Sequence, residues 1–302
     1  MPDSIHAGHA KRRLPEAGLP GVADARVLPD DSFEAAWSSV FLADELKDRL
    51  LQTVASNIRL RATVPFEALP LHGVVLLTGR PGVGKTTLAR GLADKIARVV
   101  GGLGHWAFIE VDPHALASSS LGRSQRSVEA LFGQLLEEQA GQGPLVVLLD
   151  EVETLLTDRA ALSMEANPID VHRAVDAALV GLDRLARRHP DVVVLATSNF
   201  ADAIDPALAS RADMVVQIPV PDRHGRRAIL EHTIAAIVAA FPGAAPLLGG
   251  AVLDHAAQIS EGIDGRRLRK AVAAACANDS CDPERVTADD LYASLQRTRE
   301  QL

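Results

Sequence analysis

The sequence predicts an α/β protein in which a parallel sheet covered by helices is followed by an all-helical region. Up to about residue 220, short apolar segments alternate with longer amphipathic ones, a pattern typical of buried parallel strands separated by helices. Beyond Pro221 only helical spacing of the apolar residues continues. A chain of 302 residues is long enough for two structural units. We therefore predict a large α/β domain over residues 33–220 and a smaller helical domain over 221–302.

Residues 1–32 precede the first helical pattern, and we expect them to form a flexible arm. They are rich in Pro, Gly, Asp and Arg and show no apolar periodicity. From Phe33 to Leu60 the apolar residues fall into two helically spaced sets, the first containing Trp37 and the second Leu50. Two helices are therefore expected before the sheet.

Five apolar segments are the predicted strands of the parallel sheet. They are Val74 to Thr78, Ala107 to Val111, Leu145 to Asp150, Val192 to Ser198 and Val215 to Pro219. None approaches the roughly 18 apolar residues required to cross a bilayer, so we expect no membrane span. The helical domain should contain helices over 222–241, 253–260 and 264–278, and a last one capped by Thr287 with Asp290 three positions later.

Charge and cysteine content exclude several functional classes. Lys and Arg number 31 and Asp and Glu 39, a net charge of −8, so the whole molecule repels nucleic-acid phosphates and we expect no direct nucleic-acid partner. Cys276 and Cys281 are too few for a closed zinc site and are expected to be reduced thiols. The first ten residues lack the apolar core of a secretory signal, which predicts a cytoplasmic protein.

A phosphate-binding loop is the most specific motif of the chain. Residues 79–86 fit G-x-x-x-x-G-K-[ST], directly after the first predicted strand and before a helix expected near Thr86. Glycines let backbone N–H groups surround phosphates, and the following helix N-terminus favours negative charge. Lys85 would reach the β and γ phosphates of ATP, and the Thr86 hydroxyl would hold Mg²⁺. The residues expected to contact the nucleotide are Gly79, Pro81, Gly82, Val83, Gly84, Lys85, Thr86 and Thr87.

Two carboxylates, Asp150 and Glu151, stand at the end of the third predicted strand. Parallel strands end at the same edge of a sheet, where ligands bind in open α/β folds. Together with the phosphate loop, this position predicts that Asp150 orients Mg²⁺ and that Glu151 polarises the water that attacks the γ phosphate.

The fourth predicted strand ends in Ala196-Thr197-Ser198-Asn199, and two further motifs, Ile204-Asp205-Pro206-Ala207-Leu208 and Ser210-Arg211-Ala212-Asp213, come after it. This order of motifs resembles the AAA+ ATPases, whose core is a phosphate-loop α/β domain followed by a helical lid. The resemblance implies that Asn199 helps to place the attacking water and that Arg211 is an arginine finger reaching a neighbouring subunit's nucleotide. It also implies that Arg266, after Gly265, is a lid arginine near the γ phosphate.

Within that superfamily, four segments resemble the pachytene-checkpoint ATPases, which remodel HORMA-domain proteins. They are Trp37 through Leu51, Glu151-Val152-Glu153-Thr154-Leu155, the helix 170–185 leading to Asp191, and the motifs around Asn199 and Arg211. The resemblance covers about residues 35–275 and implies a homohexameric ring whose central loops pull on a HORMA-domain client. Short bacterial relatives are associated with HORMA proteins that control nucleotidyltransferases in antiphage defence.

Two features depart from that family. The first central loop, around 115–122, lacks the usual aromatic residue, which leaves Leu116 and Leu121 to grip a peptide or shifts that task to a second loop within 159–168. Residues 1–32 are too short for the folded adaptor domain of longer members, so the client would bind the ring directly or through this arm.

Three other functions fit the phosphate loop. The main alternative is an AAA+ remodeller of a different client, of the activase-like type. A DNA-acting AAA+ protein is disfavoured by the charge of −8, and its best basic segment is Gly265 to Lys270. A small-molecule kinase would not need Arg211 from a neighbouring subunit.

Overall fold

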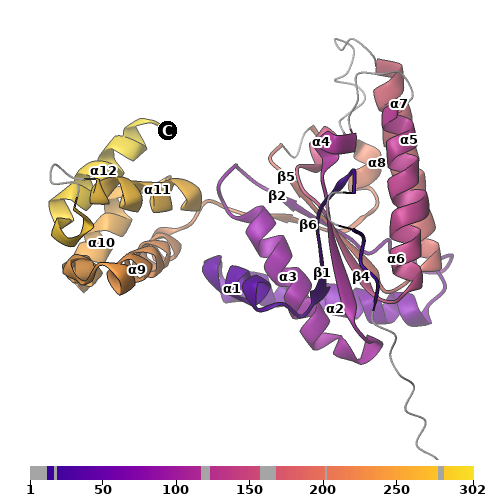
Figure 1. The fold of residues 1–302 in the computed structure, drawn as a ribbon, viewed down its shortest axis with the longest axis horizontal. Coiled ribbons are helices and arrows are strands. Elements are labelled where there is room, and N and C mark those ends of the chain that lie inside the picture. Colours follow the sequence, from indigo (N-terminus) through magenta and orange to yellow (C-terminus); the bar gives the residue numbers. More distant parts are fainter. Residues whose placement is uncertain (1–11, 17–18, 117–122, 157–167, 201–202, 278–281) are drawn as a thin grey trace, which may run out of the picture.

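A twisted sheet and a separate helical unit make up the protein (Figure 1). The computed structural model describes residues 12–16, 19–116, 123–156, 168–200, 203–277 and 282–302. In these ranges six strands form one sheet in the order β1-β3-β4-β5-β2-β6. The strands are β1 (Val22–Leu28), β2 (Val74–Thr78), β3 (Trp106–Val111), β4 (Leu145–Leu149), β5 (Val192–Ser198) and β6 (Ala212–Gln217). All neighbouring pairs are parallel except β1 with β3, which are antiparallel.

The five predicted parallel strands are confirmed, but the sheet has a sixth strand that the sequence did not predict. β1 lies in residues expected to be a flexible arm, where it pairs with β3 from Val22 to Leu28. Only Leu28 of this edge strand is fully buried, so polar Asp24 and Arg26 are tolerated and no apolar run marks it. The last strand, β6, also begins three residues earlier than predicted, because its first residues are half-buried alanine and aspartate rather than an apolar run.

Arg12 fixes the chain that precedes β1. Its guanidinium donates to the carbonyl oxygens of Pro144 and Gln139, both at 2.6 Å, and of His105 at 3.2 Å. The Gln139 side chain in turn donates to the Arg13 carbonyl at 2.9 Å. Burial lowers the pKa of Arg12 below its ordinary value, yet three carbonyl dipoles compensate the desolvated charge. The described residues before β1 are therefore attached to the sheet rather than loose.

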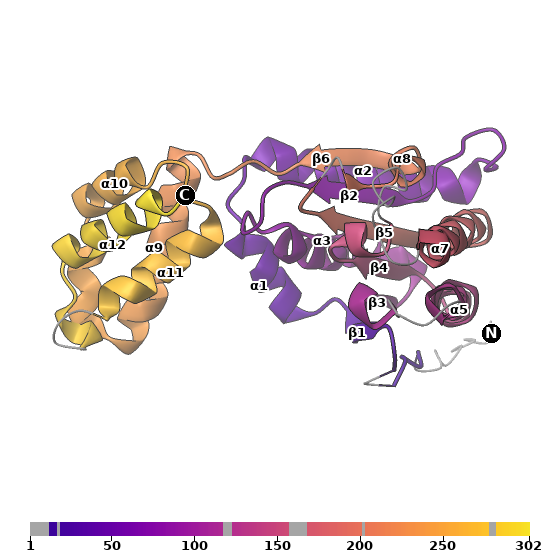
Figure 2. The ribbon, with the colours of Figure 1, turned by 90° about the horizontal axis from the view of Figure 1, so that it is seen from above.

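Helices cover both faces of the sheet, as the predicted strand–helix alternation requires (Figure 2). On one face lie α1 (Asp31–Ser39), α2 (Asp44–Thr63) and α3 (Lys85–Val99). On the other lie α4 (Pro113–Leu116), α5 (Arg123–Ala130), the π-helical turn Leu131–Leu136, α6 (Glu137–Gly141), α7 (Pro168–Arg188) and α8 (Pro206–Ala209). Alternate strand residues enter the two cores, as Val75 and Leu76 of β2 illustrate.

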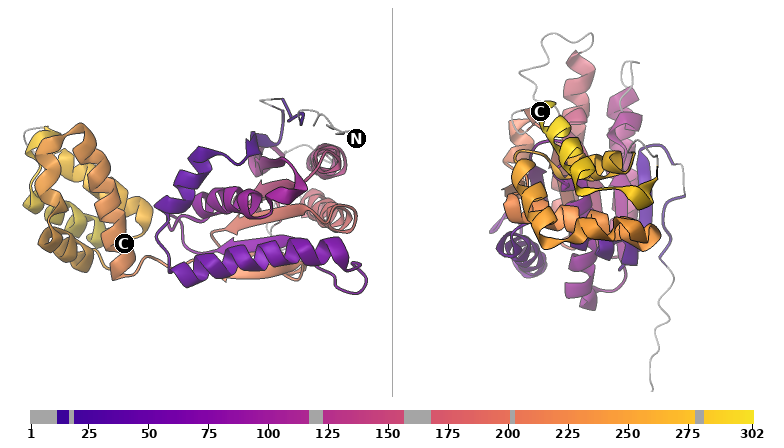
Figure 3. Two further views of the ribbon diagram at one scale, coloured as in Figure 1. Left: turned by 90° about the horizontal axis from the view of Figure 1, so that it is seen from below. Right: turned by 90° about the vertical axis from the view of Figure 1, so that its left-hand side faces the viewer.

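The helical unit has a hydrophobic core of its own. Its helices are α9 (Arg223–Ala240), α10 (Gly250–Ile259), α11 (Gly265–Cys276) and α12 (Ala288–Glu300). Asp222 and Asp264 cap α9 and α11, and Thr287 forms a capping box with Asp290. All four predicted helices are observed within a few residues of their expected bounds, and these caps explain where α9, α11 and α12 begin. The unit lies at the end of the sheet where α1 ends (Figure 3).

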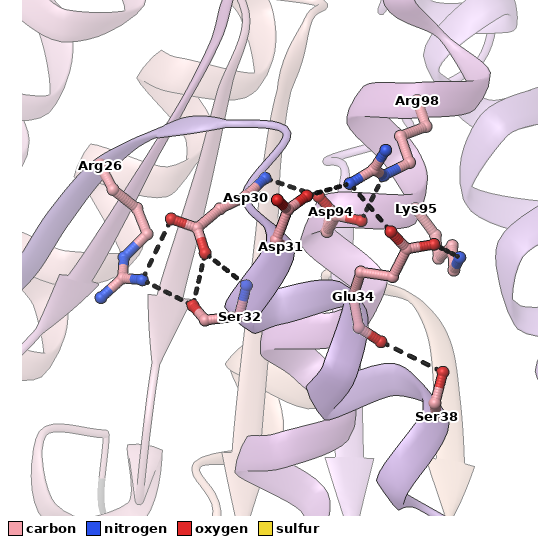
Figure 4. A network of polar contacts seen from close by, with 9 residues as sticks. All are labelled: Arg26, Asp30, Asp31, Ser32, Glu34, Ser38, Asp94, Lys95 and Arg98. Carbon is pink, nitrogen blue, oxygen red and sulfur yellow. Dashed lines mark hydrogen bonds and ion pairs between the residues drawn. The ribbon is translucent and has the colours of Figure 1, made fainter.

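A buried aspartate joins α1 to α3, the helix that follows the phosphate loop (Figure 4). Asp94 is fully buried, accepts from the Asp30 backbone N–H at 2.8 Å and pairs with Arg98 at 2.7 Å. Arg98 also reaches Glu34 of α1 at 3.2 Å. Close packing adds to this, because a Cβ atom at Gly91 would lie 2.6 Å from the backbone of Trp37. The two helices are therefore closely packed and cross-linked by polar contacts.

Among the described residues, no helix combines the length and the apolar composition needed to cross a membrane.

Candidate functional site

The phosphate loop connects β2 to α3 in the predicted place. Gly79, Gly82 and Gly84 have φ values of 147°, 85° and 97°, a region that favours glycine. A Cβ atom at Gly79 would lie 2.5 Å from the Ile218 carbonyl oxygen, and one at Gly82 would lie 2.1 Å from the Asp264 carboxylate. The loop therefore needs its glycines both for its backbone conformation and for its close contacts.

Lys85, the first residue of α3, is 6% exposed and contacts three oxygens. Its ammonium donates to the carbonyls of Gly79 at 2.8 Å and Arg80 at 3.1 Å, and to Asn199 Oδ1 at 2.8 Å. Burial lowers the Lys85 pKa below its ordinary value, and the nearby carboxylates, Glu153 first, oppose this effect. The charge is thus held at the mouth of the loop, where a phosphate would exchange for one of these oxygens.

The two predicted magnesium ligands, Thr86 and Asp150, lie together. The Thr86 hydroxyl donates to Asp150 Oδ1 at 2.8 Å, and the hydroxyl of Thr197 on β5 donates to the same oxygen. Hydroxyl and carboxylate oxygens are the donors that Mg²⁺ prefers, so this pair fits the ion expected with ATP. This role of Thr197 was not predicted, since its position near the end of a buried strand is the local signal that points to it.

Glu151 and Asn199 face each other at the ends of β4 and β5. Among the described residues, Glu151 is the one non-glycine residue with positive φ, at 50°, and its N–H donates to Thr197 Oγ1 at 3.1 Å. Such a backbone conformation costs on the order of 1–3 kcal/mol and persists where neighbours enforce it. Asn199 Nδ2 lies 3.4 Å from Glu151 Oε1, so the amide links the carboxylate to Lys85.

These residues line a cavity of about 540 Å³ between the sheet and the helical unit, a size typical of small-molecule sites. The phosphate end contains the loop, Asp150, Glu151 and Asn199. The lining also includes a largely apolar set, which is Val40, Phe41, Leu42, Pro219, Pro221, Ile229 and His232. Phosphate-binding and apolar lining residues in one cavity suit a nucleotide, whose phosphates would lie on the loop and whose base would pack against apolar side chains.

The helical unit closes the cavity through the N-terminus of α11. Arg266 lines the cavity and donates its backbone N–H to the Gly82 carbonyl at 3.1 Å. Arg267 pairs with Asp264 at 3.5 Å, and Arg269 donates to the Ser39 carbonyl at 2.9 Å. Arg269 and Lys270 also line the cavity. Because the Arg267 and Arg269 side chains already have partners, Arg266 stays the candidate lid arginine.

Arg211, the predicted arginine finger, is not among the described residues that line this cavity. It follows α8, where its guanidinium forms a two-pronged contact with the Asp183 carboxylate of α7 at 2.7 and 2.9 Å. A third bond reaches the Ala207 carbonyl at 2.9 Å. The bonds to Asp183 raise the pKa of Arg211 and lower that of Asp183. Arg211 therefore carries a fixed charge on a surface away from its own chain's cavity.

One expectation about the first central loop is wrong in the described residues. Leu116, with Leu121 one of the two residues left to grip a peptide if the first loop does so, is 2% exposed and packs in the sheet core on the α7 side. The short helix α4 turns its side chain inward, where burying an isobutyl group is favourable by roughly 2 kcal/mol. Leu121 and residues 159–167 of the second predicted loop, 159–168, lie outside the described residues, and Pro168 begins α7.

A phosphate loop, an Asp-Glu pair at a strand end and a helical lid over one cavity define a P-loop ATPase of the AAA class. Residues 75–220 match the family described as "ATPase family associated with various cellular activities (AAA)". The chain is 43% identical over 289 residues to CD-NTase-associated protein 6 of Pseudomonas aeruginosa, covering 94% of this chain and 95% of that protein. The chain therefore belongs to the CD-NTase-associated protein 6 family of AAA ATPases.

More distant similarity connects the chain to the pachytene checkpoint proteins. It is 35% identical over 224 residues to the pachytene checkpoint protein 2 homolog of Arabidopsis thaliana, covering 73% of this chain and 48% of that protein. The chain thus spans about half the length of this relative. A solved structure described as the E. coli MS115-1 HORMA:CdnC:Trip13 complex contains a similar chain, with a TM-score of 0.76, 18% identity and coverage of 92% and 95%. At that identity the likeness concerns the fold.

Proposed function

We propose that this chain hydrolyses ATP to remodel or disassemble complexes of a HORMA-domain protein, and that it thereby regulates a nucleotidyltransferase in antiphage signalling. Similarity to CD-NTase-associated protein 6 over nearly the whole chain supports the nucleotidyltransferase connection. The HORMA, CdnC and Trip13 components of the structural neighbour support the client class. Because ATP is required, we place the activity in the cytoplasm.

One observation carries the hydrolytic part of the proposal: Asn199 joins Lys85, at 2.8 Å, to Glu151, at 3.4 Å, beside the phosphate loop. Lys85 and the loop N–H groups hold the phosphates, and Asn199 orients the water. Glu151 polarises that water and accepts its proton. Mg²⁺, held by Thr86 and Asp150, would neutralise developing phosphate charge.

We also propose that the chain forms a homohexamer. Asp183 holds Arg211 away from the cavity of its own chain, so the guanidinium can act only on a neighbour. A neighbouring subunit would receive this guanidinium at its γ phosphate, while Arg266 approaches from the lid of the same chain. A ring supplies such a neighbour to every cavity, whereas a small-molecule kinase has no use for Arg211 in this position.

The test uses Glu151→Gln, which keeps the shape of the side chain and removes the base. We expect this variant to retain ATP and to hold a purified HORMA-domain protein from the same host in the presence of ATP and Mg²⁺. Lys85→Ala serves as the control and should hold neither. If the HORMA-domain protein is not held, but the variant captures a protein without a HORMA domain from a lysate of the same host with the same dependence on ATP, the activase-like alternative would be favoured instead.

A further inference from the structure

Glu153 is a third acidic residue beside the phosphate site, and unlike Asp150 and Glu151 it has no role in the proposed hydrolysis. It lies in the 3₁₀ turn Val152–Thr154 that continues from Glu151, and it is half-buried. Its Oε1 atom accepts the backbone N–H of Asn199 at 3.1 Å. The carboxylate therefore reaches from the β4 side of the sheet edge to the end of β5.

Two hydrogen bonds connect the turn after β4 to the end of β5. Besides the bond from Asn199 to Glu153, the Glu151 N–H donates to Thr197 Oγ1 at 3.1 Å. The first bond holds the backbone of Asn199, and the second holds the backbone of Glu151. Together they set the distance across which the Asn199 amide meets the Glu151 carboxylate.

The Asn199 side chain tolerates little displacement, because its amide oxygen must face a cation while its NH₂ group must face an anion. Its oxygen faces the Lys85 ammonium at 2.8 Å and its NH₂ faces the Glu151 carboxylate at 3.4 Å. Only this orientation satisfies a cation on one side and an anion on the other. A shift of the Asn199 backbone would disturb both contacts, and catalytic geometry is sensitive to displacements of about 1 Å.

The charge of Glu153 also acts on the phosphate-loop lysine. Among the carboxylates that favour the protonated form of Lys85, Glu153 has the largest effect on its pKa, ahead of Asp150 and Glu151. This second effect depends on charge alone, whereas the bond to Asn199 depends on the reach of the side chain, so substitutions can separate the two.

We propose that Glu153 is a positioning residue for ATP hydrolysis, which acts by holding the Asn199 backbone in register with Glu151 through its hydrogen bond. This inference rests on the proposed ATPase function. Loss of a hydrogen bond to a charged group corresponds to about a tenfold to hundredfold change in rate, which is the effect expected on kcat.

The experiment compares E153Q and E153D, which separate reach from charge. Glutamine keeps the acceptor oxygen in place, and we expect its kcat to stay within about threefold of wild type. Aspartate keeps the charge but is one methylene shorter, and we expect at least a tenfold loss in kcat with KM nearly unchanged. E138A, which removes an exposed carboxylate of α6, is the matched control and should behave as wild type, with thermal unfolding confirming that each variant is folded.

A double-mutant cycle tests the route through Asn199. If Glu153 acts through this residue, E153D should cost little further activity in an N199A background. A full additional tenfold loss there would overturn the proposal, as would E153D equal to wild type or folded E153Q as slow as E153D. Wild-type protein that fails to hydrolyse ATP would contradict the proposed function itself, which is a different result.

Discussion

The two arginines expected near the γ phosphate lie in different surroundings. Arg266 lines the cavity of its own chain, beside the phosphate loop. Arg211 lies outside that cavity and is held by three hydrogen bonds to Asp183 and the Ala207 carbonyl. The residues proposed to bind phosphate and Mg²⁺ and to act as the base are thus brought together within one chain, whereas Arg211, the proposed finger, is held outside the cavity. If both arginines act at the γ phosphate, a single chain holds only part of the proposed catalytic site.

The largest loss of activity is expected for Arg211→Ala. Loss of an arginine finger supplied by a neighbour should lower kcat by about 10³ to 10⁵, because the developing phosphate charge loses its guanidinium. ATP binding should change much less, since the cavity is intact. Steady-state ATPase assays and equilibrium nucleotide binding measure the two quantities.

Mixing Arg211→Ala with Glu151→Gln tests whether the finger acts between chains. In a mixed ring, an Arg211→Ala subunit offers an intact Glu151 to a neighbour that carries an intact Arg211. We therefore expect activity above that of either variant alone. A mixture with no recovery would show that both residues serve the same chain's cavity, and the comparison would fail.

Glu151→Gln changes the proposed base, which lines the cavity, rather than the arginine outside it. Replacing the base by an amide should lower kcat by about 10² to 10⁴, the usual contribution of general base catalysis. The amide oxygen that the substitution introduces can still accept the hydrogen bond from Asn199 Nδ2, so the geometry of the phosphate site should be kept. ATP affinity should therefore stay close to that of wild type. Single-turnover hydrolysis gives the rate, and turnover near the wild-type value would exclude Glu151 as the base.

Asp183→Asn sharpens the role of the outward-facing arginine. An amide cannot accept both guanidinium bonds that the carboxylate accepts at 2.7 and 2.9 Å, so Arg211 should lose its fixed orientation and kcat should fall about tenfold, by roughly one charged hydrogen bond. The matched control is Asp254→Asn, which removes an Arg–Asp contact of 2.9 Å on the helical unit and should leave kcat unchanged. Equal activities of both variants would mean that Asp183 does not orient the finger.

The smallest effect on chemistry is expected for Asp94→Asn, which tests the polar contacts between α1 and α3. The change leaves buried partners of a charged network incompletely satisfied (Figure 4) and should lower the free energy of unfolding by about 1–3 kcal/mol. Glu34→Gln removes an exposed ion-pair partner of the same network and should lower the free energy of unfolding much less, because solvent screens exposed ion pairs. Urea unfolding followed by circular dichroism measures both, and equal losses would contradict the special role of the buried carboxylate.

Much of the fold follows from local patterns. The buried parallel strands form continuous apolar runs, and the caps at Asp222, Asp264 and Thr287 mark helix starts through their own side chains. The edge strand Val22–Leu28 lacks such a run because one sheet edge buries little of it. The inward turn of Leu116 also escaped prediction, since its direction depends on the sheet core into which it packs.

The nucleotide site is predictable from local motifs, because the phosphate loop is contiguous in the chain and parallel strands bring Asp150, Glu151 and Asn199 to one edge of the sheet. Three contacts become visible only in the folded chain: Asp183 holds Arg211, 28 residues away, Glu153 holds the Asn199 backbone, 46 residues away, and Arg12 attaches the first described residues to the sheet. Contacts between distant residues depend on how elements pack, and no local spacing encodes them.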